Sequence, residues 1–146
     1  MVDRHVGPVT MDFLIEHVAA QVGILYSVPV VAIGCDSIRC CVDANLEISV
    51  PALEHLRHLL SETNCIYVFG INTGINTDAG IHWGVGLLDP RRHILVVINT
   101  LPESSKISGK MKKAANTVLK VVAWTENFVG GFSLKLYHTC LQQFGY

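Results

Sequence analysis

The segment at residues 82–99 restricts the possible folds more than any other part of this chain. Two apolar runs, at residues 82–88 and 94–98, flank Asp89-Pro90-Arg91-Arg92, and both aspartate and proline favour turns. The pattern predicts a β-hairpin. Residue numbers 82 and 99 sum to 181, as do 90 and 91, so a turn centred on Pro90-Arg91 places His82 beside Asn99.

Apolar periodicity and turn residues predict the remaining elements. We expect helices at residues 10–21, from Pro51 onward and at 106–128 (one long helix or two short ones), strands at 28–33, 65–71 and 132–137, and a Gly-rich loop at 71–81. Thr10 is expected to cap the first helix. An apolar stripe on that helix is expected to face the core: Phe13, Leu14, Val18 and Val22. Helices and strands are interspersed without strict alternation, which predicts the α+β class.

The composition is that of one globular domain. The chain has 146 residues, of which 50% are hydrophobic and 16% charged, so it is rich in core material. A formal net charge of −1 gives no reason to expect nucleic acid or an anionic membrane as a partner. No apolar run approaches the roughly 20 residues that cross a bilayer, and the N-terminus does not resemble a secretory signal.

The cysteines predict an intracellular protein. Their number, five, is odd, and without a signal sequence this favours reduced thiols in the cytoplasm or nucleus. Cys35, Cys40 and Cys41 are close in sequence, but their spacing fits no zinc pattern and no histidine lies near them. We expect buried structural thiols there, and neither a metal nor a cofactor.

Several polar residues match the needs of a cysteine peptidase site. Such a site needs a thiolate, a histidine beside it, a group that orients the histidine and a donor for the oxyanion. His82 is the candidate base, and Asn99 is positioned to accept its ring N–H. Trp83 is expected to point to the opposite face of the strand. A single His-Trp pair at a strand start is more often structural than catalytic, so only the joint pattern favours a site.

Two motifs resemble the ubiquitin-like-protein-specific protease family, the cysteine peptidases that process or remove SUMO-type modifiers. The first runs from His82-Trp83 through Asp89-Pro90 to Asn99-Thr100-Leu101, where the family has His-Trp, a strand, a turn and a second strand that ends in an acidic residue. The second is Leu141-Gln142-Gln143-Phe144-Gly145-Tyr146, where the family has a glutamine shortly before the nucleophile. The resemblance covers residues 60–146.

The resemblance implies a fold and a set of roles. The fold would be papain-like, with a central, mostly antiparallel sheet flanked by helices, and residues 1–146 would be a single partial catalytic domain. His82 would be the general base and Asn99 its orienting group. Gln143, or less favourably Gln142, would stabilise the oxyanion, and Trp83 would cover the channel for the modifier's glycine tail. The expected partner is a SUMO-type modifier or its conjugates.

The sequence departs from the family pattern at two places. Asn99 stands where the family usually has aspartate, although papain-type enzymes use asparagine there. The Asp-Cys-Gly that carries the family's nucleophile is expected just after Tyr146, so we expect a fold incomplete at its C-terminus and a chain that is marginally stable or aggregates. The alternatives are a catalytically inactive module that binds a ubiquitin-like protein and, less favoured, an acyltransferase on the same fold.

Overall fold

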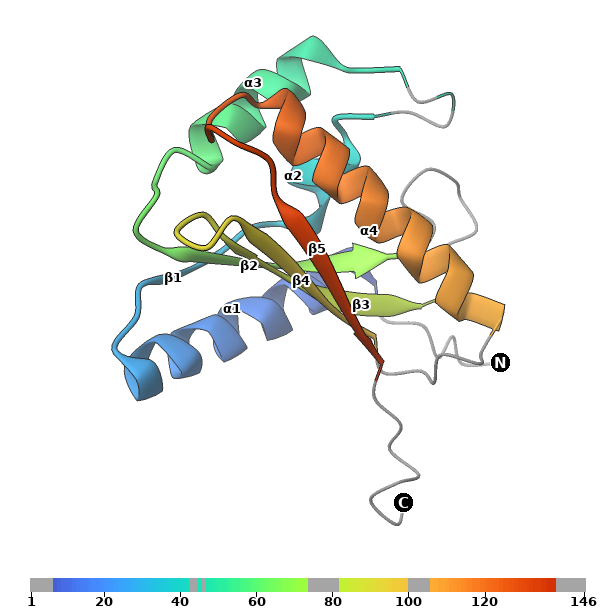
Figure 1. Ribbon diagram of the computed structural model, residues 1–146. Coiled ribbons are helices and arrows are strands. Elements are labelled where there is room, and N and C mark those ends of the chain that lie inside the picture. Colours follow the sequence, from blue (N-terminus) through green and yellow to red (C-terminus); the bar gives the residue numbers. More distant parts are fainter. Residues whose placement is uncertain (1–6, 43–44, 46, 74–81, 100–105, 139–146) are drawn as a thin grey trace.

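The computed structural model describes residues 7–42, 45, 47–73, 82–99 and 106–138, which form one five-stranded sheet with helices on both faces (Figure 1). In chain order the elements are α1 (Pro8–Tyr26), β1 (Val30–Ala32), α2 (Cys35–Arg39), α3 (Val50–Leu59), β2 (Ile66–Asn72), β3 (Trp83–Asp89), β4 (Ile94–Asn99), α4 (Lys106–Trp124) and β5 (Ser133–His138). The α+β prediction is confirmed.

The strands follow one another across the sheet in chain order. β2, β3 and β4 are antiparallel neighbours, whereas each edge strand is parallel to its neighbour, β1 to β2 and β5 to β4. A parallel connection needs a crossover, and α4 provides it between β4 and β5. This crossover returns the chain to the sheet beside β4, which places the end of β5 next to Asn99.

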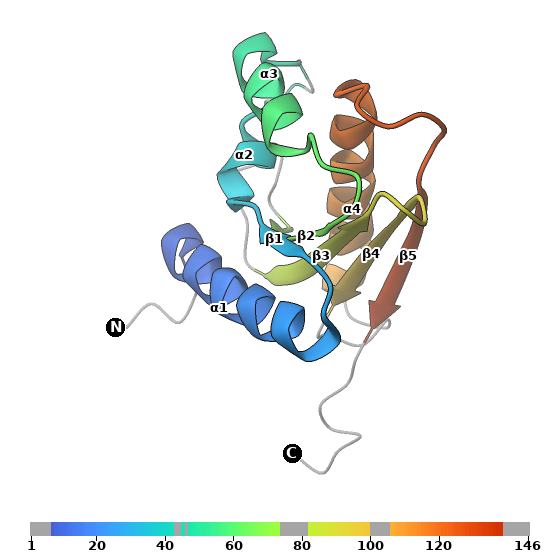
Figure 2. The same ribbon diagram turned by 90° about the vertical axis from the view of Figure 1, so that its left-hand side faces the viewer.

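Alternation along the strands gives the sheet two different faces. Leu88, Leu95 and Val97 are fully buried and belong to the main core together with Met111 of α4. α1 lies against β1 and β2 on the other face, where a side chain added at Gly70 would meet Met11 (Figure 2). The sheet is therefore the middle layer between α4 on one side and α1 on the other.

The predicted hairpin exists, but its register differs from the prediction by two residues. Asp89 pairs with Ile94, so paired residues sum to 183 rather than 181. The loop consists of four residues, in which Arg91 N–H donates to Asp89 Oδ1 (3.0 Å) and His93 adopts a left-handed backbone (φ 52°). A shift of two residues moves a side chain along its strand without changing its face. His82 therefore remains on the same face as Asn99.

The first helix is longer than predicted, and its apolar stripe faces solvent. α1 begins at Pro8, after Gly7 in the N-cap position, and Thr10 makes no cap. The predicted core residues Phe13, Leu14 and Val18 are exposed, and the buried positions are Ile15 and Ala19. The helix is apolar on nearly every side, so periodicity did not indicate which side faces the core.

The exposed apolar surface of α1 predicts self-association of the 146-residue chain. Val9, Phe13 and Ile24 are 84%, 68% and 81% exposed. Apolar surface of this kind is favourable to bury, so we expect concentration-dependent oligomers in analytical ultracentrifugation. Phe13→Gln should reduce the association, whereas Glu16→Gln, a change at an exposed polar position of the same helix, should not. A monomer at all concentrations, with a sharp and reversible thermal transition, would contradict this prediction.

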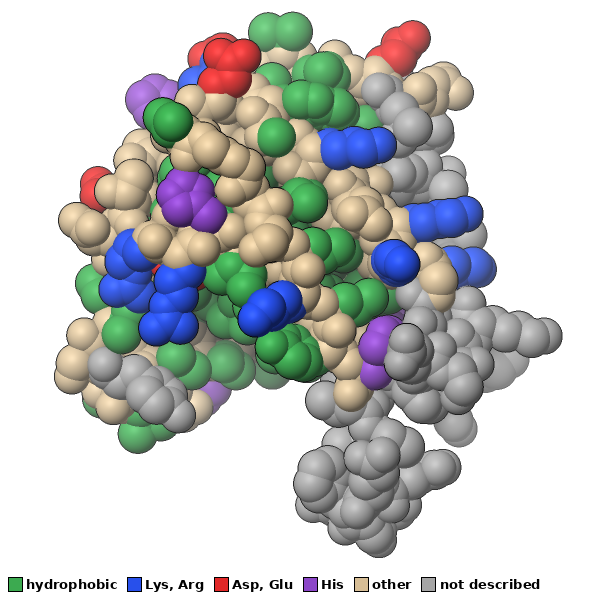
Figure 3. Space-filling view, viewed as in Figure 1, with side chains coloured by type: hydrophobic (Ala, Val, Ile, Leu, Met, Phe, Trp, Pro, Cys, Tyr) green, Lys and Arg blue, Asp and Glu red, His purple; other side chains and the backbone are tan. Residues whose placement is uncertain are grey.

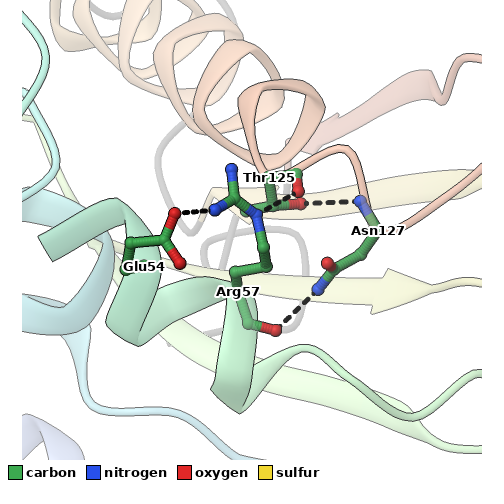
Figure 4. Close-up of polar contacts among 4 residues, drawn as sticks. All are labelled: Glu54, Arg57, Thr125 and Asn127. Carbon is green, nitrogen blue, oxygen red and sulfur yellow. Dashed lines mark hydrogen bonds and ion pairs between the residues drawn. The ribbon is translucent and has the colours of Figure 1, made fainter. Parts of the chain in front are cut away.

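A small polar cluster connects α3 to the end of α4 (Figure 4). Arg57 Nε donates to the Thr125 carbonyl (2.7 Å), and its guanidinium also pairs with Glu54. Asn127 Nδ2 donates to the carbonyls of Arg57 (2.7 Å) and Leu60 (2.9 Å). The last carbonyls of a helix lack partners within the helix, so Asn127 satisfies groups that α3 cannot satisfy itself.

Asn127→Ala is expected to lower the free energy of unfolding by about 1 kcal/mol, because it leaves the two carbonyls at the end of α3 without this donor. Chemical denaturation measures the change. Asn116→Ala is the matched control, because Asn116 is exposed and, among the described residues, donates within its own helix, to the Lys112 carbonyl. An equal effect of the two substitutions would contradict the role given to Asn127.

The surface of α4 is basic, but its basic side chains are not concentrated into one patch. Lys110, Lys112, Lys113 and Lys120 are exposed, and in Figure 3 the blue side chains along this helix stand among other side chains. This arrangement is typical of a solvated helix face. Within the described ranges, the structure contains no helix with the length and apolarity needed to cross a membrane.

Candidate active site

His82 and Asn99 lie in hydrogen-bond contact at one end of the β3–β4 hairpin. His82 Nε2 is 2.7 Å from Asn99 Oδ1. A carboxamide oxygen can only accept, so His82 Nε2 carries the proton and donates it. In the neutral imidazole this leaves the lone pair on Nδ1, which is the nitrogen available to a reacting group.

The backbone of His82 is held by the neighbouring strand. β2 and β3 pair as far as Asn72 and Trp83, and one further bond follows, in which Thr73 N–H donates to the His82 carbonyl (2.9 Å). His82 thus projects from an extended part of the sheet rather than from a free loop. This anchoring limits the positions that its imidazole can take relative to Asn99.

A second histidine, which the sequence did not indicate, completes the cluster. Asn99 is fully buried and pairs in register with His138, the last residue of β5. Asn99 Nδ2 lies 3.3 Å from His138 Nδ1. A buried carboxamide is costly unless it is hydrogen-bonded, and here both of its ends have a partner. The order His82–Asn99–His138 thus joins the β3–β4 hairpin to β5, which follows it only after α4.

Trp83 lies on the face of the sheet opposite to His82. A side chain added at Gly70 would come within 3.2 Å of the Trp83 ring and 2.9 Å of Met11, so glycine leaves room for the indole. The indole is half-buried beside α1. Its predicted position on the opposite face is confirmed, and its role in substrate binding stays a prediction.

The predicted oxyanion donors, Gln142 and Gln143, lie outside the described residues, as do Cys140 and residues 74–81 of the predicted loop, whose first two residues belong to β2. Their positions relative to His82 are therefore not part of the geometry given above. The assignment of Gln143 stays a prediction based on the resemblance.

Two of the buried thiols, Cys35 and Cys41, are unsuited to act as the nucleophile. Burial, followed by the nearby Asp12 carboxylate, raises the pKa of Cys35 to about 12, and burial raises the pKa of Cys41 to about 11. Thiols with such pKa values carry almost no thiolate at neutral pH. Cys40 is exposed, so the expectation that it is buried was wrong: it caps the C-terminus of the short helix α2, whose buried positions are Cys35 and Ile38. Among the described residues, no group of three His, Cys, Asp or Glu side chains could hold a metal ion.

No protein-family model and no curated protein matches this chain. Solved structures do match. One is the SUMO protease Ulp1 with its catalytic cysteine oxidized to a sulfenic acid, with a TM-score of 0.55 and 15% sequence identity over 94% of this chain and 57% of that chain. Another is the C-terminal Ulp1 protease domain in complex with Smt3, the yeast ortholog of SUMO, with a TM-score of 0.55, 14% identity, and coverage of 94% and 56%.

This chain has the fold of the Ulp1 protease domain. The likeness is one of backbone arrangement, since the sequences are only 14–15% identical. The chain spans a little over half the length of the solved structures that it matches. A shared fold does not by itself establish a shared activity, so function must be argued from the site.

Proposed function

We propose that this chain is part of a cysteine peptidase domain that acts on a ubiquitin-like modifier of the SUMO type. The observation that carries the proposal is the 2.7 Å contact between His82 Nε2 and Asn99 Oδ1, on a backbone with the Ulp1 fold. A histidine with one nitrogen held by an amide, and with no bond from its other nitrogen to any described residue, has the arrangement of a general base. The thiolate would come from the segment that follows Tyr146.

The proposed reaction has two stages. In the first, His82 Nδ1 takes the proton of the cysteine thiol, and the thiolate attacks the carbonyl of the modifier's C-terminal glycine. His82 gives that proton to the leaving amine, the C–N bond breaks and a thioester forms. In the second, His82 takes a proton from water, the resulting hydroxide attacks the thioester, and the proton returns to the departing sulfur. Gln143 would donate to the oxyanion in both stages, and Trp83 would line the channel for the tail.

Asn99 shapes this chemistry in a particular way. It holds the His82 ring and its tautomer by accepting the Nε2 proton, but a neutral amide adds no negative charge beside the imidazolium that forms. The imidazolium is then stabilised by geometry and hydrogen bonding more than by an ion pair. We therefore expect Asn99→Ala to reduce turnover more than it reduces modifier binding.

Cleavage of a modifier precursor tests the proposal. Protein extended past Tyr146 should release the tail of a SUMO-type precursor, with mass spectrometry showing a free modifier carboxylate. Transfer of the acyl group to a second protein would instead identify an acyltransferase. No cleavage of any ubiquitin-like precursor or conjugate would contradict the peptidase proposal.

The second candidate is a module that binds a ubiquitin-like protein without turnover. Two observations favour it: a neutral amide stands at Asn99 in place of the usual acid, and the buried thiols Cys35 and Cys41 have raised pKa values. It predicts saturable binding of a modifier by calorimetry without release of a cleaved product. Binding and turnover together would exclude this candidate.

A further inference from the structure

The two ends of the Asn99 side chain face different histidines. Its oxygen lies 2.7 Å from His82 Nε2, and its nitrogen lies 3.3 Å from His138 Nδ1. Asn99 is fully buried at the end of β4, His82 directly precedes β3, and His138 ends β5. We propose that His138 is a positioning residue that fixes the orientation of the Asn99 carboxamide and, through it, the tautomer of His82. This inference rests on the proposed function of His82 as a base.

An asparagine in this place has a problem that an aspartate does not have. The two oxygens of a carboxylate are equivalent, so either can accept from the histidine. A carboxamide has one accepting end and one donating end, and rotation by half a turn exchanges them. If the NH2 group faced His82, Nε2 would have to accept, the proton would move to Nδ1, and the nitrogen needed as a base would be blocked.

His138 provides the contact that selects one orientation. β4 and β5 are parallel neighbours, and Asn99 pairs directly with His138, so the two side chains emerge side by side on the same face. Asn99 Nδ2 can only donate, which requires an unprotonated Nδ1 on a neutral His138. In that state His138 accepts from the nitrogen end of the carboxamide and leaves the oxygen end for His82.

The two bonds support one another. The donation from Asn99 to His138 and the donation from His82 to Asn99 are both satisfied by a single arrangement of the carboxamide. Reversal of the carboxamide would require both histidines to exchange tautomers. His138 does not contact the reacting atoms in this scheme, and its effect reaches His82 only through Asn99.

The direct test is NMR of the 146-residue chain. Long-range 1H–15N correlation spectra at neutral pH should show His82 and His138 as neutral rings that both carry the proton on Nε2. His138→Phe keeps an aromatic ring but removes the acceptor, so the His82 signal should shift toward the Nδ1-protonated tautomer. His138→Gln offers a side-chain oxygen as a replacement acceptor and should restore the wild-type tautomer. His55→Phe, at an exposed site on α3, should leave the His82 signal unchanged.

A double-mutant cycle in the protein extended past Tyr146 supplies the kinetic readout. His138→Phe should lower kcat by roughly 3- to 10-fold, the range expected for one hydrogen bond, with little change in KM. In the Asn99→Asp background the same substitution should have a clearly smaller effect, because a carboxylate needs no orienting partner. Equal effects in the two backgrounds would overturn the inference.

The remaining outcomes are also decisive. A wild-type His82 protonated on Nδ1, or a His138→Phe chain with an unchanged His82 tautomer, would overturn the role of His138. If His138→Phe does not fold, the wild-type and His138→Gln tautomers decide the question. If the wild-type tautomers are as expected but no modifier is cleaved, the proposed peptidase function fails while the positioning by His138 stands.

Discussion

Replacing His82 with alanine is expected to slow modifier hydrolysis by about 10²- to 10⁴-fold in protein extended past Tyr146, the usual contribution of a positioned general base. In the proposed reaction the imidazole activates the thiol and protonates the leaving amine in the first stage and takes a proton from water in the second, so its loss affects both stages. Binding of the modifier should change little, because the loss arises in the transition state. Rates from a fluorogenic modifier amide and affinities from calorimetry measure the two quantities separately.

His55→Ala is the matched control for this prediction. His55 is an exposed histidine on α3, so its removal should leave both the rate and the affinity close to wild type. A small loss of rate in His82→Ala, similar to that of the control, would contradict the assignment of His82 as the base. A parallel loss of affinity and folding would show instead that His82 is structural.

Gly86→Ala is expected to lower the free energy of unfolding by about 1–3 kcal/mol, the usual cost of an extra methyl group in a close-packed core. A Cβ at this position in β3 would lie 2.5 Å from Cε2 and 2.9 Å from Cζ of Phe69, which is fully buried on the neighbouring strand β2. Phe69 pairs directly with Gly86, so the Phe69 ring cannot move away from the added methyl group without displacing the core. Urea or guanidinium denaturation measures the change.

Two further variants give this prediction its controls. Gly109→Ala adds the same methyl group where nothing lies within 4 Å, on α4, and should stabilise the protein by about 0.5–1 kcal/mol because alanine favours helix. Phe69→Leu should partly rescue Gly86→Ala by making room for the added methyl group. If Gly86→Ala were neutral, or if Phe69→Leu gave no rescue, the packing described between β2 and β3 would be wrong.

The hairpin shows how a sequence can predict a contact through an imperfect register. Turn chemistry at Asp89-Pro90 located the loop, but the left-handed conformation of His93 moved its centre by one residue. When the centre of the loop moves by one residue, the strand pairing shifts by two residues. Strand alternation also repeats every two residues, so each side chain keeps its face. His82 and Asn99 therefore remain on one face, now as diagonal rather than direct neighbours.

The faces of α1 could not be predicted for a different physical reason. A helix reveals its buried side when apolar and polar residues alternate with its period, and this helix has apolar residues nearly all round. Burial is decided instead by where β1 and β2 lie, which places Ile15 and Ala19 inward and leaves Phe13 exposed. The sequence predicted that one apolar side of this helix faces the core, but only the packing shows which side is covered.

The contact of His138 with Asn99 could not be predicted from the sequence, because it depends on a long-range parallel pairing of strands. Antiparallel hairpins follow from short local turns, whereas β4 and β5 pair across the whole of α4. The length of that crossover does not set the register, so nothing local connects His138 to Asn99. A polar residue at the end of the last strand was the only available signal.

Labelling with a modifier that carries a C-terminal vinyl electrophile tests most directly whether the His82–Asn99 pair serves a thiol nucleophile. In protein extended past Tyr146, we expect a covalent adduct on a cysteine that follows Gln143, formed rapidly by the wild type and slowly by His82→Ala. If no ubiquitin-like modifier forms an adduct, or if the adduct forms equally fast without His82, then the His82–Asn99 pair does not serve a thiol nucleophile.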